Sequence, residues 1–179
     1  DYQWRPEQQG DVYFRLLRAI SGQQVSVKAA DAIHQRFLNL FEDQYPHAQQ
    51  VLEMDAATLR SAGLSRQKVA YVQNVAAYFT EQNLLNQNWT NWENEAIIKK
   101  LTEIKGIGRW TVEVVLMFCL NRGNIFPIDD LGIQLTMQRL YNLESDKRQL
   151  KKSMKEIANN WQPYRTLACY YLWSWKHRW

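Results

Sequence analysis

The amino-acid sequence predicts an all-α protein of about ten helices, arranged as two small lobes around a cleft. Apolar residues recur along most of the chain at intervals of three or four, which is the period of one face of a helix. No stretch of the 179 residues keeps the alternating apolar and polar pattern of a β-strand. Polar residues that favour helix N-caps precede several of the apolar-periodic stretches. The length suits either one compact helical body or two small lobes that share a cleft.

Four helices of the first half are delimited by capping residues. The predicted N-caps are Asp11, Ser26, Asp55 and Ser65, and the helices that they open extend to about Gly22, Leu40, Ala62 and Phe79. Residues 83–94 are Asn-rich, contain Trp89 and Trp92, and lack a helical period. We therefore interpret 1–179 as a single domain in which two lobes are divided near 83–94.

A glycine-containing turn joins two amphipathic helices in the second half of the chain. Residues 101–108 read LTEIKGIG, and the helix that follows covers about 109–121. A short loop then leads to Asp129 and Asp130, which precede another apolar-periodic stretch. Three further helices are predicted. The first follows Asp130, the second runs from Ser145 to Trp161, and the third begins with Pro163 and ends at about Lys176.

Composition and charge exclude several classes of protein. The 22 Lys and Arg exceed the 18 Asp and Glu, and the resulting charge of +4 and pI near 9.1 fit a nucleic-acid partner without requiring one. Cys119 and Cys169 lie far apart inside apolar helical patterns, which indicates buried thiols in a reducing compartment. Two cysteines are too few for a four-cysteine iron–sulfur cluster, and the three histidines lack zinc spacing. The longest apolar run, Val114 to Leu120, is too short to span a membrane, so a soluble cytosolic protein is expected.

The turn with Gly106 and Gly108 has the features of an anion-binding site. Glycine lacks a Cβ atom, so the backbone can adopt positive φ there and approach another surface closely. The amides at the start of the following helix are exposed and carry the partial positive charge of its N-terminus. A nucleic-acid phosphate is the natural ligand, with Lys105 and Arg109 beside it. A purely structural role is the alternative, because glycines close many helices.

This segment resembles the helix-hairpin-helix DNA glycosylases, which combine a Gly-x-Gly hairpin with a single catalytic Asp about twenty residues beyond it. Gly106-Ile107-Gly108-Arg109-Trp110-Thr111 followed by Pro127-x-Asp-Asp130 is most similar to the alkylpurine branch, the 3-methyladenine DNA glycosylase II type. The similarity extends from about Asp11 to Trp173. It implies a helix-hairpin-helix motif, a monofunctional enzyme of base excision repair, and double-stranded DNA with damaged bases as the partner.

The resemblance assigns the chemistry to Asp130. A carboxylate beside the sugar would stabilise the oxocarbenium-like transition state and position a water molecule. A merely local N-cap is the alternative for Asp130, and Asp129 is left as a cap or support. Trp110 stands where bifunctional members carry a lysine that forms a Schiff base, so hydrolysis without strand cleavage is expected. Trp110 and Trp173 would line the pocket for the flipped base, although Trp173 suits a core position nearly as well.

The resemblance also implies where DNA is held. Gln24 or its neighbour Gln23 matches the residue that fills the gap left by an extruded nucleotide. The alternative is that both residues belong to a solvent-exposed connection between two helices and have no contact with DNA. Val114 and Leu131 stand where relatives carry tyrosines, which leaves the lesion spectrum open. No cofactor is required, but main-chain carbonyls at the hairpin would hold a sodium or potassium ion. The expected cation ligands are Thr102, Ile104 and Ile107, and the expected DNA contacts at the hairpin are Lys105, Gly106, Ile107, Gly108, Arg109 and Thr111.

Two other functions fit the same pattern. A non-catalytic DNA-structure binder would use the hairpin as a phosphate clamp without any base chemistry, and the pair Asp130 and Trp110 argues against it. A glycosylase for oxidised or deaminated bases would differ only in its pocket lining. In each case we expect a monomer with no membrane association, in a bacterial cytosol or a eukaryotic nucleus.

Overall fold

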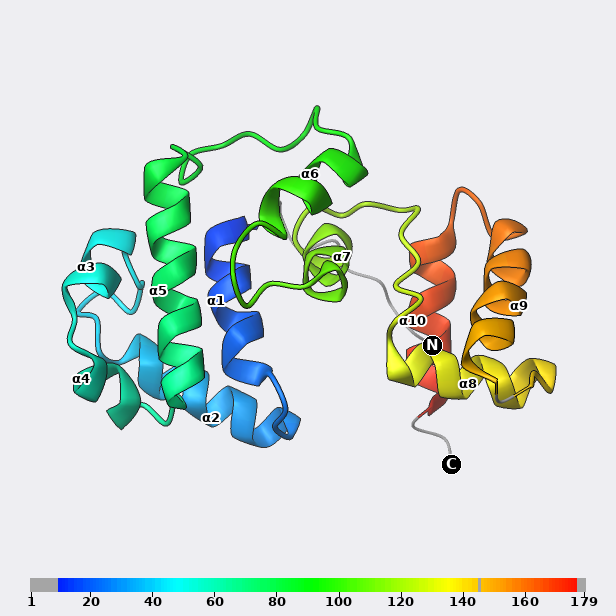
Figure 1. Cartoon of the computed structure of the whole chain (residues 1–179), viewed down its shortest axis with the longest axis horizontal. Helices are drawn as coiled ribbons and strands as arrows, with labels where there is room; N and C mark the ends of the chain where they lie inside the picture. Colours follow the sequence, from blue (N-terminus) through cyan, green and yellow to red (C-terminus); the bar gives the residue numbers. More distant parts are fainter. Residues whose placement is uncertain (1–9, 145, 177–179) are drawn as a thin grey trace. The chain divides into compact units, whose positions relative to one another are not determined.

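The computed structural model describes residues 10–144 and 146–176, which form ten α-helices (Figure 1). The helices are α1 (Val12–Gly22), α2 (Val27–Leu38), α3 (Ala48–Glu53), α4 (Ala56–Ser61), α5 (Arg66–Glu81), α6 (Asn94–Leu101), α7 (Arg109–Phe118), α8 (Leu131–Tyr141), α9 (Lys147–Asn159) and α10 (Arg165–Lys176). No β-strand occurs in the described ranges. The prediction of an all-α fold with about ten helices is confirmed.

The chain divides into two compact units, and each is described by itself. The first unit spans Gly10–Val115, with α1 to α6 and most of α7, and the second unit contains the described residues from Leu116 onward. The boundary therefore falls within α7. Residues 83–94, where the sequence suggested a division, lie inside the first unit between α5 and α6. Trp89 is buried there, with its ring 5.2 Å from the ring of Trp92.

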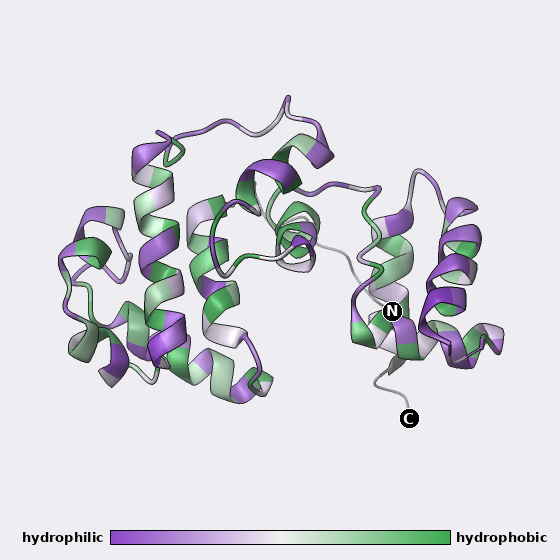
Figure 2. Ribbon diagram, viewed as in Figure 1, coloured by the Kyte–Doolittle hydropathy of each residue, from purple (hydrophilic) through white to green (hydrophobic). Residues whose placement is uncertain are grey.

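In the first unit, α1 packs against α2 and α5, while α3 and α4 pack against α5. Apolar residues lie along the helices that meet (Figure 2). Burial of each large apolar side chain contributes on the order of 2 kcal/mol to the stability of the fold. The largest fully buried side chains of these helices are Tyr13, Leu16, Leu17, Ile20, Phe37, Leu59 and Phe79.

The capping residues predicted in the first unit are confirmed. Each cap satisfies amides that the first turn of a helix leaves without partners. The side-chain oxygens of Asp11, Ser26, Asp55 and Ser65 accept hydrogen bonds from the amides of Phe14, Ala29, Thr58 and Lys68. The helix α3 was not predicted, because it has only six residues and its N-cap, His47, makes no side-chain capping bond.

In the second unit, α8 packs against both α10 and α9. The thiols of Cys119 and Cys169 are buried, as predicted. The N-cap of α9 is Asp146, whose carboxylate accepts hydrogen bonds from two amides of the first turn. Ser145, which was expected to open this helix, lies outside the described residues. None of the described helices is both long and apolar enough to cross a membrane.

A histidine in the core of the first unit makes the stability depend on pH. His34 is 7% exposed, and its ring lies 5.4 Å from that of Phe14 and 6.4 Å from that of Phe37. Within the described residues, neither ring nitrogen has a hydrogen-bond partner. Burial, and secondarily the positive charge of Arg18, lowers the pKa of His34 from 6.5 to about 4, against a smaller opposing effect of Asp31.

We expect the free energy of unfolding to fall as the pH decreases from about 6.5 towards 4. The unfolded chain binds a proton at His34 in this range, whereas the folded protein does not. The loss due to this residue is about 2 kcal/mol at pH 5, and it is absent above pH 7. Urea unfolding at pH 7.5 and pH 5 should show a smaller decrease for His34→Leu than for the wild type. An equal decrease in the two proteins would contradict this role of His34.

Candidate functional site

The turn between α6 and α7 in the first unit contains the predicted hairpin. It covers residues 102–108, and the amide of Ile107 donates to the carbonyl of Ile104 at 3.0 Å. Gly106 has φ +106°, and a Cβ atom there would lie 2.3 Å from Cγ of Tyr71 on α5. Only glycine fits this position, because both the dihedral angle and the aromatic ring exclude a side chain. At Gly108, by contrast, a Cβ atom would meet no described atom within 4 Å.

Side chains from α5 and from the end of α1 hold this turn in place. Asn74 donates from Nδ2 to the carbonyl of Lys105 at 3.1 Å, and Gln23 donates from Nε2 to the carbonyl of Gly106 at 3.1 Å. Gln23 therefore has a structural role, which brings the connection between α1 and α2 beside the hairpin. Gln24, the other member of the predicted pair, is exposed and has φ +56°. Of the two residues, Gln24 is the one available to contact DNA.

Arg109, the first residue of α7, is engaged in ion pairs. Its guanidinium donates to Glu95 of α6 at 3.0 Å and to the buried Glu113 at 2.9 Å. Hydrogen bonding with Arg109 lowers the pKa of Glu95, while the pairing raises that of Arg109 further above its usual value. Arg109 therefore joins α6 to α7, and a phosphate at its predicted DNA contact would compete with two carboxylates. This contact stays a prediction.

The other predicted hairpin residues differ in exposure. Lys105 is exposed, as a phosphate contact requires, and Trp110 is 42% exposed in the first turn of α7. Ile107 and Thr111 are buried, so their predicted contact with DNA would be made by main-chain atoms. The carbonyls of Lys105 and Gly106 accept the side-chain bonds of Asn74 and Gln23, and neither is a predicted cation ligand. Of the predicted cation ligands Thr102, Ile104 and Ile107, the carbonyl of Ile104 accepts the amide of Ile107 within the turn. Cation binding at these three carbonyls stays a prediction.

In the second unit, Asp130 is the N-cap of α8. Its Oδ1 accepts hydrogen bonds from the amide of Ile133 at 2.8 Å and from Nε1 of Trp173 at 2.9 Å. These two bonds hold the carboxylate from two sides. Because the residue is only 9% exposed, the carboxylate is also largely shielded from bulk water. Asp130 is thus itself the cap, whereas Asp129 forms an exposed ion pair with Lys151 of α9. The N-terminus of α8 carries a partial positive charge, which attracts a negatively charged group in this position.

Aromatic side chains support the indole that binds Asp130. The ring of Trp173 stacks on that of Phe118 at a centroid distance of 5.7 Å and lies 6.1 Å from that of Tyr170. The hydroxyl of Tyr170 donates to the carbonyl of Met117 at 3.2 Å. Phe118 and Tyr170 were not predicted as site residues. In the sequence, the only feature that links Tyr170 to the site is its position one helical turn before Trp173. No sequence feature indicates a role for Phe118.

The loop that leads to Asp130 is fixed to α10. Thr166 Oγ1 accepts from the amide of Ile125 at 3.0 Å and donates to the carbonyl of Arg122 at 2.6 Å. Arg165 donates from Nε to Oδ1 of Asn124 at 2.7 Å. These bonds span more than forty residues of sequence. They give the acidic residue a rigid support from the same helix that carries Trp173.

The site residues are therefore distributed over the two units. The hairpin, Gln24 and Trp110 belong to the first unit, whereas Asp130 and Trp173 belong to the second. The structure brings Asp130 and Trp173 into direct contact, and it brings Gln23 into contact with the hairpin. A pocket shared by Trp110 and Trp173 stays a prediction.

A hairpin with a glycine of positive φ between two helices, followed by an aspartate held at the N-terminus of a later helix, is the arrangement expected of the helix-hairpin-helix DNA glycosylases. Residues 17–163 match the family model described as "HhH-GPD superfamily base excision DNA repair protein". The chain belongs to this superfamily.

Individual relatives and solved structures agree with this membership. DNA-3-methyladenine glycosylase 1 of Schizosaccharomyces pombe is 36% identical over 173 residues, which cover 95% of this chain and 75% of that protein. A 3-methyladenine DNA glycosylase of the same organism, solved in complex with abasic DNA, superposes with a TM-score of 0.83 at 34% identity, covering 96% of this chain and 85% of that one. A DNA-3-methyladenine glycosidase from Bacillus halodurans gives a TM-score of 0.83 at 33% identity, with coverages of 98% and 79%. The chain spans only 58% of a Bacillus subtilis relative that is 34% identical over 168 residues.

Proposed function

We propose that this protein is a monofunctional DNA glycosylase of base excision repair. It hydrolyses the N-glycosidic bond of alkylated purines such as 3-methyladenine, flipped out of double-stranded DNA, and leaves an abasic site. The observation that carries the proposal is the buried carboxylate of Asp130, held by the amide of Ile133 and the indole of Trp173. Membership of the superfamily and the names of the similar proteins support the same reaction.

The carboxylate of Asp130 acts on charge that develops during bond cleavage. As the base departs, positive charge grows on the deoxyribose, and a fixed negative charge beside the sugar stabilises it. The two hydrogen bonds to Oδ1 prevent the carboxylate from reorienting, so little reorganisation is needed in the transition state. The same group accepts a proton from the attacking water.

Trp110 determines both the type of reaction and the preference for the base. An indole cannot form a Schiff base with the sugar, so the product is an abasic site and the strand stays intact. The half-exposed ring of Trp110 is available to stack on a flipped base. An alkylated purine that carries a positive charge gains cation–π attraction which a normal base lacks.

The partner is double-stranded DNA that contains a damaged base, and the protein acts on it as a monomer in the cytosol or nucleus. The exposed Lys105 and the amides that follow Gly108 anchor a phosphate, and Gln24 fills the gap in the duplex. No cofactor takes part in the reaction. A sodium or potassium ion at the carbonyls of Thr102, Ile104 and Ile107 would shield the phosphate charge at the hairpin.

Incubation with duplex DNA that contains methylated purines tests the proposal. We expect release of free 3-methyladenine, which chromatography detects, and intact strands until alkali cleaves the abasic sites. Strand scission without alkali would contradict the monofunctional assignment. A duplex with a neutral oxidised base serves as the competing substrate, and its preferred excision would contradict the role of Trp110. DNA binding without release of any base would indicate a non-catalytic binder.

A further inference from the structure

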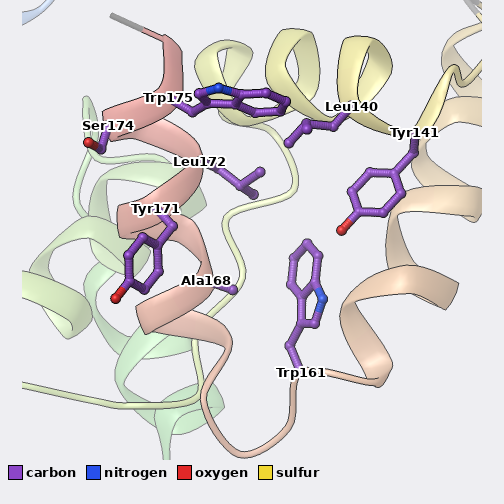
Figure 3. A pocket seen from close by; sticks show the side chains of 8 residues that line it. All are labelled: Leu140, Tyr141, Trp161, Ala168, Tyr171, Leu172, Ser174 and Trp175. Atoms are coloured by element: carbon purple, nitrogen blue, oxygen red, sulfur yellow. The ribbon is translucent and has the colours of Figure 1, made fainter. Parts of the chain in front are cut away.

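The second unit contains an aromatic cavity that the proposed excision reaction does not use. Its volume is about 390 Å³, and it lies between the C-terminal end of α8, the segment after α9, and one face of α10. Figure 3 shows the side chains that surround it. The principal ones are Leu140, Tyr141, Trp161, Tyr171, Leu172 and Trp175.

This cavity is separate from the site around Asp130. Asp130 caps the N-terminus of α8, while Leu140 and Tyr141 stand at its other end, roughly 15 Å away for a helix of 11 residues. On α10, Trp173 binds Asp130, whereas its neighbours Leu172 and Trp175 line the cavity. Helix α10 therefore contributes the indole of Trp173 to the site around Asp130 and the indole of Trp175 to the cavity.

The shape and chemistry of the cavity suit a planar ring. Four of its lining side chains are aromatic, and none of them is charged. Trp161 is held by an edge contact with Phe126, with ring centroids 5.8 Å apart. A fixed indole wall beside further aromatic rings favours stacking of a heteroaromatic ring, and it costs little conformational entropy on binding.

The charge on the adjacent helix selects an anionic ligand. Exposed Arg148, Lys152 and Lys155 lie on one face of α9, opposite its buried residues Leu150 and Met154. Figure 2 shows α9 as a largely hydrophilic helix. Trp161, which lines the cavity, follows the end of α9 by two residues. A cationic ring would be repelled here, so a methylammonium ligand does not fit.

We propose that this cavity and the basic stripe of α9 form a second binding site, which takes an unpaired nucleobase of single-stranded DNA. The base stacks among Tyr141, Trp161 and Trp175, and the phosphates of the adjoining nucleotides lie along Arg148, Lys152 and Lys155. Aromatic platforms beside a basic track bind single strands without strong sequence preference. The site would retain the protein on a strand that is locally unpaired, apart from the duplex contact at the hairpin.

Fluorescence anisotropy with a labelled twelve-nucleotide oligothymidylate tests this site. The exposed Tyr141 and Tyr171 are changed to Ala together, and Tyr164→Ala is the matched control, because Tyr164 is 67% exposed and does not line the cavity. We expect the double variant to lose about tenfold in affinity for the oligonucleotide, as loss of base stacking predicts. The control should bind like the wild type, and excision from methylated duplex should be unchanged in both.

A second pair of variants tests the phosphate contacts. Lys152→Gln with Lys155→Gln should weaken binding and reduce its salt dependence, whereas Lys147→Gln, off the stripe on the same helix, should have a smaller effect. Equal losses in the tyrosine variant and its control would overturn the proposal. Unchanged oligonucleotide affinity in the double variant would also overturn it. The same holds if an acidic, aromatic-containing peptide binds more tightly at Tyr141 and displaces the oligonucleotide.

Discussion

Replacement of Asp130 by Asn should reduce the rate of base release by about 10²- to 10³-fold, the range found when a fixed electrostatic group of an active site is removed. The amide oxygen of Asn still accepts hydrogen bonds from the amide of Ile133 and the indole of Trp173. Asn is also as good an N-cap as Asp, so the stability of α8 should change little. The loss of rate therefore reports the missing negative charge rather than a damaged fold. Single-turnover release of 3-methyladenine is the measurement.

Asp129→Asn is the matched control for this change. Asp129 precedes Asp130 in the chain but forms an exposed ion pair with Lys151, which contributes at most about 1 kcal/mol to stability. Its rate of base release should stay within about threefold of the wild type. Anisotropy with lesion-containing duplex should show that both variants still bind DNA. If Asp130→Asn kept more than a tenth of the wild-type rate, the catalytic assignment of Asp130 would be wrong.

The parts of the fold that the sequence predicts are those set by local interactions. The N-caps at Asp11, Ser26, Asp55 and Ser65 are confirmed because a cap bonds to amides only two or three residues further on. The helix α3 was missed because six residues are too few for a hydrophobic period. The equally short α4 was predicted because Asp55 caps it, whereas the N-cap of α3, His47, makes no side-chain capping bond. For a short helix, the capping residue is therefore the signal that the sequence provides.

The candidate site depends on contacts that local patterns do not contain. Trp173 meets Asp130 across 43 residues of sequence, and the pair of Arg109 and Glu95 spans 14. The sequence treats Gly106 and Gly108 alike, yet of these two glycines only Gly106 has positive φ. Their difference arises from Tyr71 on α5, a neighbour that no spacing rule identifies. The residue types in the sequence therefore predicted the chemistry of the site. Tertiary packing decides which of these residues contact one another and which backbone conformation each one adopts.

Gly106→Ala should lower the free energy of unfolding by about 2–5 kcal/mol, from the overlap of the new methyl group and the strained backbone together. The added Cβ atom would lie 2.3 to 2.6 Å from three carbons of the Tyr71 ring, and φ at this position is +106°. The turn would have to shift, which would disturb the bonds from Asn74 and Gln23 that hold it. Urea unfolding gives the stability, and anisotropy with duplex DNA gives the accompanying loss of affinity.

Gly108→Ala separates stability from DNA binding at the same hairpin. A Cβ atom there meets no described atom within 4 Å, so the free energy of unfolding should change by less than about 1 kcal/mol. Its methyl group would instead stand between the phosphate and the amides at the start of α7, and duplex affinity should fall.

Combining Tyr71→Ala with Gly106→Ala removes the overlap but not the dihedral strain, so the double variant should regain only part of the lost stability. A Gly106→Ala protein as stable as the wild type would show that neither the ring contact nor the positive φ constrains the hairpin.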